Sequence, residues 1–146
     1  MDKSVTEAPD TLSALKALTK LAEFNNWLDI RVISGDRGEV ELHLPWRPEF
    51  AQYNGYLHAS IVGGLIDTAC GFAAFSMTRS GVLASQFSVR CLRPALASTF
   101  VVRGRVVKRG RQQIFTEAQL YAIDAPEKLF ATGDAILVPA GPTASS

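Results

Sequence analysis

One carboxylate, Asp67, lies in the middle of the most apolar segment of the chain, residues 59–77. A carboxylate without a partner is costly in such surroundings, so its presence there indicates a specific role. Asp67 could activate a water molecule as a general base, or attack a carbonyl carbon as a nucleophile. The alternative is a purely structural Asp67 that accepts hydrogen bonds from a Ser, a Thr or a partner chain.

Backbone amides at the start of the same segment could supply the second half of a hydrolytic site. Ala59 and Ser60 follow His58, where a long helix is predicted to begin. The first N–H groups of a helix have no acceptor within it and lie at the positive end of its dipole. The Ala59 N–H is therefore predicted to stabilise the oxyanion that forms when a carbonyl is attacked. His58 itself is a second candidate for the general base.

The spacing of Ala59 and Asp67 predicts how many chains a site needs. Eight residues correspond to about 12 Å along a helix, at roughly 1.5 Å per residue. One helix therefore cannot bring both groups to the same carbonyl, whereas two antiparallel helices across a two-fold axis can. The active unit is predicted to be at least a homodimer with two equivalent sites.

Hydrophobic periodicity and turn residues predict the elements that position these groups. Asp10 and Thr11 can cap a first helix, which is expected to end at residues 24–26. The long helix, about His58 to Met77, is apolar nearly all round and needs cover on most sides. Consecutive strands joined by short turns predict a curved antiparallel sheet of five to six strands around this helix, an α+β fold. The strand-like runs are residues 27–34, 39–44, 83–92, 99–108, 112–123 and 129–138.

Three glycines lie inside the predicted long helix: Gly63, Gly64 and Gly71. A glycine within a helix costs about 0.5–1 kcal/mol relative to alanine, so each needs a packing reason. They are expected to keep the helix slim enough for the sheet to wrap it closely.

Residues 39–44 alternate between apolar and polar, which predicts a strand with one buried face. The outward face carries Glu39, Glu41 and His43, and His43 is expected to be merely solvated. Loop residues 45–56 follow.

The composition is that of one globular domain spanning residues 1–146, with flexible tails at about 1–9 and 140–146. The net charge of +1 argues against a dedicated nucleic-acid binder. Cys70 and Cys91 lie in no metal-binding spacing, and are expected to be reduced and mostly buried. With no signal peptide visible, a cytoplasmic protein without metal or cofactor is expected. The charge on Asp67 makes residues 59–77 a core helix rather than a membrane span.

The segment from Gln52 to Gly71 resembles the hotdog-fold thioesterases of the phenylacetate-degradation (PaaI-like) type. That family shows Asn-x-x-Gly-x-x-His-Gly-Gly, followed on the helix by Asp or Glu, then Ala and Gly. The later runs FSVRCLRPA and VVKRG resemble the family's next two strands. The positions that match its helix motif are Gly55, His58, Asp67, Ala69 and Gly71.

The resemblance implies an acyl-CoA thioesterase that hydrolyses a small aryl- or medium-chain acyl-CoA, with Asp67 catalytic and His58 bonding near the helix start. Two departures stand out. The family's Gly-Gly is Ala59-Ser60 here, and its Asn is Gln52, although Asn54 lies nearby. A Ser or Thr that helps hold the water in the family corresponds to Ala84 by strict spacing, or to its neighbour Ser85. Homodimers, commonly paired into homotetramers, are also implied.

Coenzyme A carries phosphates, which forked arginine donors bind well. The candidates after the long helix are Arg90, Arg93, Lys108, Arg109 and Arg111. All of them would also be ordinary solvated charges at a sheet edge or turn.

Two other functions remain open from the sequence. A hotdog dehydratase would pair a catalytic His with an acid in a different motif. A non-catalytic acyl-CoA-binding or regulatory protein would keep the fold without the hydrolysis.

Overall fold

The computed structural model describes residues 10–141, so the tail predicted at about 1–9 and most of the one predicted at 140–146 lie outside the described residues. Ala140, which was expected to belong to a flexible end, donates its N–H to the carbonyl of Gly81 at 3.0 Å. The helices are α1 (Thr11–Lys20), α2 (Glu23–Leu28), the short 3-10 helix η1 (Pro48–Phe50) and α3 (Ala59–Thr78). The strands are β1 (Arg31–Asp36), β2 (Glu39–Pro45), β3 (Val82–Cys91), β4 (Thr99–Arg109), β5 (Ile114–Ala122) and β6 (Ala125–Pro139).

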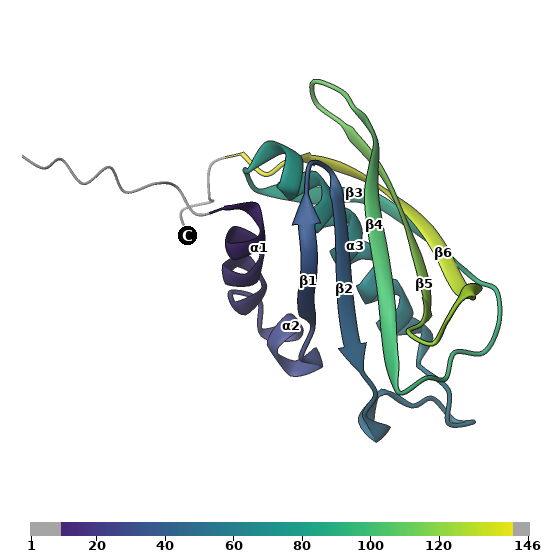
Figure 1. Cartoon of the computed structure of the whole chain (residues 1–146). Coiled ribbons are helices and arrows are strands. Elements are labelled where there is room, and N and C mark those ends of the chain that lie inside the picture. The colour runs from purple at the N-terminus through teal and green to yellow at the C-terminus, as the bar shows by residue number, and fades with distance from the viewer. Residues whose placement is uncertain (1–9, 142–146) are drawn as a thin grey trace, which may run out of the picture.

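One antiparallel sheet of six strands wraps around α3 (Figure 1). The strand order is β1-β2-β4-β5-β6-β3, so β3 is an edge strand although it follows α3 directly in the chain. The main core forms between α3 and the concave face of the sheet, and Leu65, Ile66 and Ala69 are almost completely buried there. This arrangement confirms the predicted α+β fold. By length and composition α3 could cross a membrane, but most of it is enclosed by the protein.

Glycines on the strands, rather than those on the helix, allow the closest approach of sheet to helix. A Cβ at Gly104 of β4 would lie 2.5 Å from the carbonyl oxygen of Ala69, and one at Gly133 of β6 would lie 2.5 Å from Ile66. A Cβ at Gly71 would meet nothing within 4 Å. The expectation that Gly71 serves close wrapping is therefore wrong, because this residue faces open space.

The N-terminal segment forms two helices where one was predicted. Asp10 caps α1 as expected, accepting the Ser13 N–H at 2.7 Å. The chain breaks after α1, and the Asn26 side chain donates to the Lys20 carbonyl at 2.8 Å. Trp27 lies in α2, so the strand predicted from residue 27 begins only at residue 31. Asp29 ends α2 in the left-handed conformation, with φ of 61°.

The other strands match the periodicity with small shifts at their ends. In β2, Val40, Leu42 and Leu44 are buried as predicted. The β5–β6 turn is tighter than expected, so that β6 begins at Ala125. The predicted loop at residues 45–56 contains η1, which buries Phe50 completely.

Candidate active site

The first turn of α3 leaves one backbone amide without an acceptor. His58 caps the helix, and its Nδ1 accepts the Ser60 N–H at 3.0 Å. The amides of Ile61 and Val62 donate to the His58 carbonyl at 2.9 and 3.1 Å. The Ala59 N–H has no acceptor among residues 10–141. It is exposed at the positive end of the helix, where it can donate to an anionic oxygen.

This amide opens into a pocket of about 460 Å³, called here the Ala59 pocket. Gln52 and Asn54 both line it, because a tight turn with Gly55 at φ 84° folds them toward the start of α3. The Asn54 N–H donates to the Gln52 side-chain oxygen, which leaves the Gln52 amide nitrogen for other partners. The remaining lining residues are Tyr56, Leu57, Val62, Cys91, Leu92, Arg93, Pro94, Ala95 and Phe130.

Asp67 lies in a second pocket, of about 520 Å³, called here the Asp67 pocket. Its carboxylate is half-buried and has no hydrogen-bond or ion-pair partner in the described part of the chain. Burial raises the pKa of Asp67 above its usual value of 3.8. The neighbouring Thr68 hydroxyl is occupied by the Gly64 carbonyl, at 2.7 Å. The structural role considered for Asp67 within its own chain therefore finds no partner between residues 10 and 141.

The two pockets share no lining residue. Ala59 and Asp67 are eight residues apart on one straight element, which separates them by about 12 Å along its axis. A single chain thus holds the Ala59 amide and the Asp67 carboxylate in different pockets.

The Asp67 pocket is mostly apolar, and besides Asp67 its polar side chains are those of Asn25 and Thr68. The end of α1 and the start of α2 contribute Leu18, Leu21, Ala22, Phe24 and Asn25. Only the folded chain shows that Leu21 and Phe24, which are exposed, face this pocket. The opposite wall comes from the start of β3 and from Leu137 of β6.

Ala84 and Ser85 differ in where they lie. The pairing of β3 with β6 shifts register between Ala84 and Gln86, so Ser85 is the extra residue of a β-bulge. Ala84 lines the Asp67 pocket, whereas Ser85 does not. The Ser85 hydroxyl donates to the carbonyl of Ile136 at 3.2 Å.

The arginines proposed for coenzyme A lie in three places. Arg93 lines the Ala59 pocket. Arg90 lies 3.8 Å from Asp134 in an ion pair on the outer face of the sheet. Arg109 and Arg111 lie at the β4–β5 turn, at the far end of β4 from the start of α3 (Figure 1). Only Arg93 of this set lines a pocket that contains a candidate catalytic group.

Two expectations about side-chain exposure are wrong. Cys70 is buried, and burial raises its pKa to about 11, but Cys91 is exposed because it ends the edge strand. His43 is only 18% exposed, and its Nε2 lies 3.0 Å from a carboxylate oxygen of Glu41. Arg103 pairs with the other oxygen of Glu41 at 3.4 Å, a neighbour that the spacing along β2 cannot reveal.

A curved antiparallel sheet around one long helix, with a carboxylate and a free amide on that helix, is the architecture of a hotdog-fold thioesterase. The chain belongs to the thioesterase superfamily, whose family profile matches residues 54–127.

Individual relatives support this assignment. A thioesterase family protein from Silicibacter pomeroyi is 34% identical, with a TM-score of 0.81 over 88% of this chain and 96% of that one. The E. coli PaaI protein from the phenylacetic acid degradation operon has the same fold, with a TM-score of 0.82 at 20% identity over 92% of this chain and 96% of its own. A Saccharolobus solfataricus protein named "Putative esterase" is 27% identical over 79% of this chain and 84% of its own length.

Proposed function

We propose that the protein is an acyl-CoA thioesterase that uses Asp67 of one protomer together with the Ala59 N–H of its partner. The observation that carries this proposal is the division of the site. The half-buried Asp67 carboxylate and the Ala59 amide both lack partners among residues 10–141, yet they lie in separate pockets of the same chain. A second copy with an antiparallel α3 would join one pocket of each kind.

In the proposed reaction, the Asp67 carboxylate takes a proton from a water molecule, whose oxygen attacks the thioester carbonyl carbon. The carbonyl oxygen becomes an oxyanion and accepts a hydrogen bond from the Ala59 N–H. The C–S bond then breaks, and the leaving CoA thiolate receives the proton held by Asp67. The products are the free acid and coenzyme A, and Asp67 is again ionised.

The exposed edge of β3 supports pairing with a second copy. This strand pairs only with β6 in the described part of the chain, and Arg90 is its one charged residue. Natural edge strands are usually short, charged or covered, because an open edge invites pairing. Phe87 is half-exposed on the α3 side of this edge, beside Gly63. Antiparallel pairing of two β3 strands would therefore place two α3 helices side by side in opposite directions.

Arg93 is the preferred ligand for the phosphates of coenzyme A. Its exposed side chain lines the Ala59 pocket, and its guanidinium offers forked donors for a phosphate at the far end of the pantetheine arm. Arg90 is engaged by Asp134, and Arg109 and Arg111 lie at the other end of β4.

Thiol release from a panel of acyl-CoAs tests the activity. A binding protein or a dehydratase would release no thiol, and that outcome would refute the proposal. Asp67→Asn should remove the activity, while Asp124→Asn, the same change on an exposed turn, should leave it intact.

Mixing two inactive variants tests the division of the site between chains. Ala59→Pro deletes the N–H, and it suits this position because proline is favoured at the first residue of a helix. The preceding His58 already has an extended backbone, with φ −63° and ψ 138°, as a residue before proline requires. Ala59→Gly, which retains the N–H, is the matched control.

If the site is shared, Asp67→Asn and Ala59→Pro chains mixed after unfolding and refolding form heterodimers with one intact site. Random pairing makes half of the dimers mixed, so about a quarter of the wild-type activity should return. A site within one chain would give no recovery, because each chain would still lack one group.

A further inference from the structure

We infer that the Asp67 pocket binds the tail of an unbranched medium-chain acyl group along α3, in the space left open by Gly71 and behind a wall formed by α2. This inference rests on the proposed thioesterase function and specifies its substrate class. It makes Gly71 and Phe24 specificity-determining residues and Arg47 a positioning residue.

The floor of the pocket is one face of α3. Gly64, Asp67, Gly71 and Phe75 follow one another at intervals of three or four residues and all line the pocket. From Asp67 to Phe75 this face extends for about 12 Å. An extended chain advances about 1.2 Å per bond, so a tail of roughly eight to ten carbons fits beside it.

Gly71 determines how much room this floor leaves. A Cβ built there would meet nothing within 4 Å, in contrast to Gly64, where a Cβ would lie 3.0 Å from the ring of Phe24. Within one chain, the space above Gly71 is therefore open, and it belongs to a mostly apolar pocket. Thr68 offers no free donor to a polar tail, because its hydroxyl bonds to the Gly64 carbonyl.

The outer wall is α2, whose Leu28 is completely buried in the core and whose Asn26 side chain bonds to the Lys20 carbonyl, while Phe24 and Trp27 are about half-exposed. Phe24 of α2 contacts the Gly64 turn and stacks on Trp27, with the ring centroids 6.3 Å apart. Trp27 in turn meets the buried ring of Phe50 edge-on, at 5.5 Å. The position of Phe24 over the pocket thus depends on where Trp27 is held.

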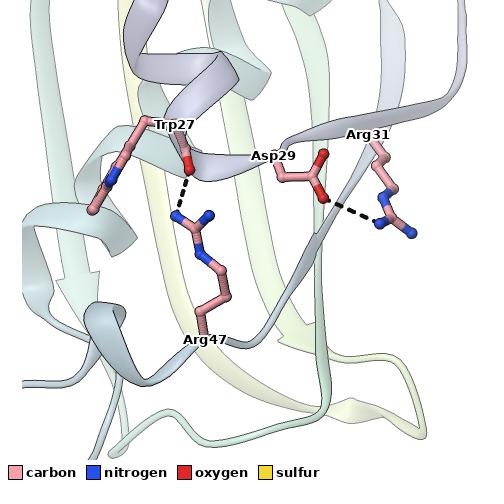
Figure 2. Close-up of polar contacts among 4 residues, drawn as sticks. All are labelled: Trp27, Asp29, Arg31 and Arg47. Atoms are coloured by element: carbon pink, nitrogen blue, oxygen red, sulfur yellow. Dashed lines mark hydrogen bonds and ion pairs between the residues drawn. The ribbon is translucent and has the colours of Figure 1, made fainter.

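The side chain of Arg47 holds Trp27 through a hydrogen bond and a cation–π contact (Figure 2). Its guanidinium donates to the Trp27 carbonyl near the C-terminal end of α2, where a cation is favourable. It also lies over the rings of Trp27 and Phe50, 5.3 and 4.5 Å from their centroids. Figure 2 shows a second arginine nearby, Arg31, which within residues 10–141 pairs only with the exposed carboxylate of Asp29, at 3.1 Å.

The first test compares acyl-CoAs of four and ten carbons on the full-length protein. One methylene in an apolar pocket changes specificity by about 10–200-fold. Gly71→Leu should therefore lower kcat/KM for decanoyl-CoA at least tenfold relative to butyryl-CoA. Gly71→Ala should give a smaller change in the same direction. Gly63→Ala, which adds a methyl group to the same helix outside this pocket, should leave the ratio unchanged.

Arg47→Met tests the wall, and Arg31→Met is its matched control. Loosening α2 should raise KM for decanoyl-CoA several-fold while kcat for butyryl-CoA is kept. The emission of Trp27, measured with Trp46→Phe in the background, should shift. Arg31→Met should change none of these. Equal effects of Arg47→Met on both substrates would overturn the positioning role.

The outcomes separate this inference from the proposed function. Wild-type activity with an unchanged chain-length ratio in Gly71→Leu would refute the inference alone. Dissociation of the oligomer in Gly71→Leu would show that a second copy fills the pocket, which also refutes it. If the wild type releases no thiol, the proposed function fails. In that case calorimetry tests whether the Asp67 pocket binds the acyl tail. Gly71→Leu should then weaken the binding of decanoyl-CoA.

Discussion

Nδ1 of His58 lies 3.0 Å from the backbone nitrogen of Ser60 and 2.7 Å from its hydroxyl oxygen, so the imidazole serves as the N-cap of α3. Because Nδ1 accepts the Ser60 N–H, a general-base role is not needed to explain this residue. His58→Asn, which supplies another good cap, should retain most of the thioesterase activity. His58→Ala should lower the free energy of unfolding by about 1 kcal/mol, measured by urea denaturation. A loss of about 10²-fold or more in kcat for folded His58→Asn would point to base catalysis instead.

Asp67→Asn should lower the thioesterase activity without lowering the thermal stability. The carboxylate is half-buried without a partner, so its ionised form is disfavoured in the folded state. Removing the charge should leave Tm at neutral pH unchanged or higher, while kcat falls by about 10²–10⁴-fold. Calorimetry and thiol release on the same preparation measure both. A clearly lower Tm would mean that the carboxylate makes stabilising contacts in the assembled protein.

The pH dependence of this stability difference has a definite sign. Burial raises the folded-state pKa of Asp67 above 3.8, so its stabilising contribution is complete below pH 3.8 and is lost as pH rises through the folded pKa. The difference in Tm, Asp67→Asn minus wild type, should therefore increase as pH rises from 3.8 through the folded-state pKa. Above that pKa the difference should stay constant. Because the base must be ionised, kcat/KM of the wild type should rise with pH through an apparent pKa above 3.8. An acid limb at or below 3.8 would contradict the assignment.

Phe87→Lys should separate the protomers and remove the activity. Phe87 is 49% exposed on the unpaired edge strand, where a buried charge would oppose pairing with a second copy. Ile123→Lys is a matched control, because Ile123 is also 49% exposed but lies at the β5–β6 turn. Sedimentation velocity should show loss of the oligomer, and the thiol assay loss of activity, in Phe87→Lys but not in Ile123→Lys. An active monomeric Phe87→Lys would refute the shared site.

Arg93→Ala should weaken binding of coenzyme A but not of short thioesters. Losing a hydrogen bond to a charged group costs about 1.5–3 kcal/mol, which corresponds to a KM increase of roughly tenfold or more. Arg93→Ala should not raise KM for an acyl thioester of N-acetylcysteamine, because this substrate has no phosphates. Arg109→Ala should leave KM unchanged for both substrates, since Arg109 lies at the far end of β4.

Several parts of this structure could be read directly from the sequence. The bounds of α3, the burial of Val40, Leu42 and Leu44, and the Asp10 cap all depend on neighbours within a few residues. Hydrophobic periodicity and capping act over the same short range, so these features can be predicted from the order of residue types alone. The break between α1 and α2 and the end of α2 were missed, because the first involves Asn26 reaching back to Lys20 and the second a left-handed backbone at Asp29.

By itself, the sequence determined that a long apolar helix has Asp67 in its middle and begins at Ala59 with a backbone N–H that lacks an acceptor. Helix geometry then fixes the distance between these two groups. The tertiary structure decided that β3 lies at the sheet edge, that Cys91 is exposed and that Gly71 opens into a pocket. It also decided that Arg47 fastens the wall of that pocket through Trp27. These features arise from strand order and from contacts between segments far apart in the chain, which no local pattern of residue types specifies.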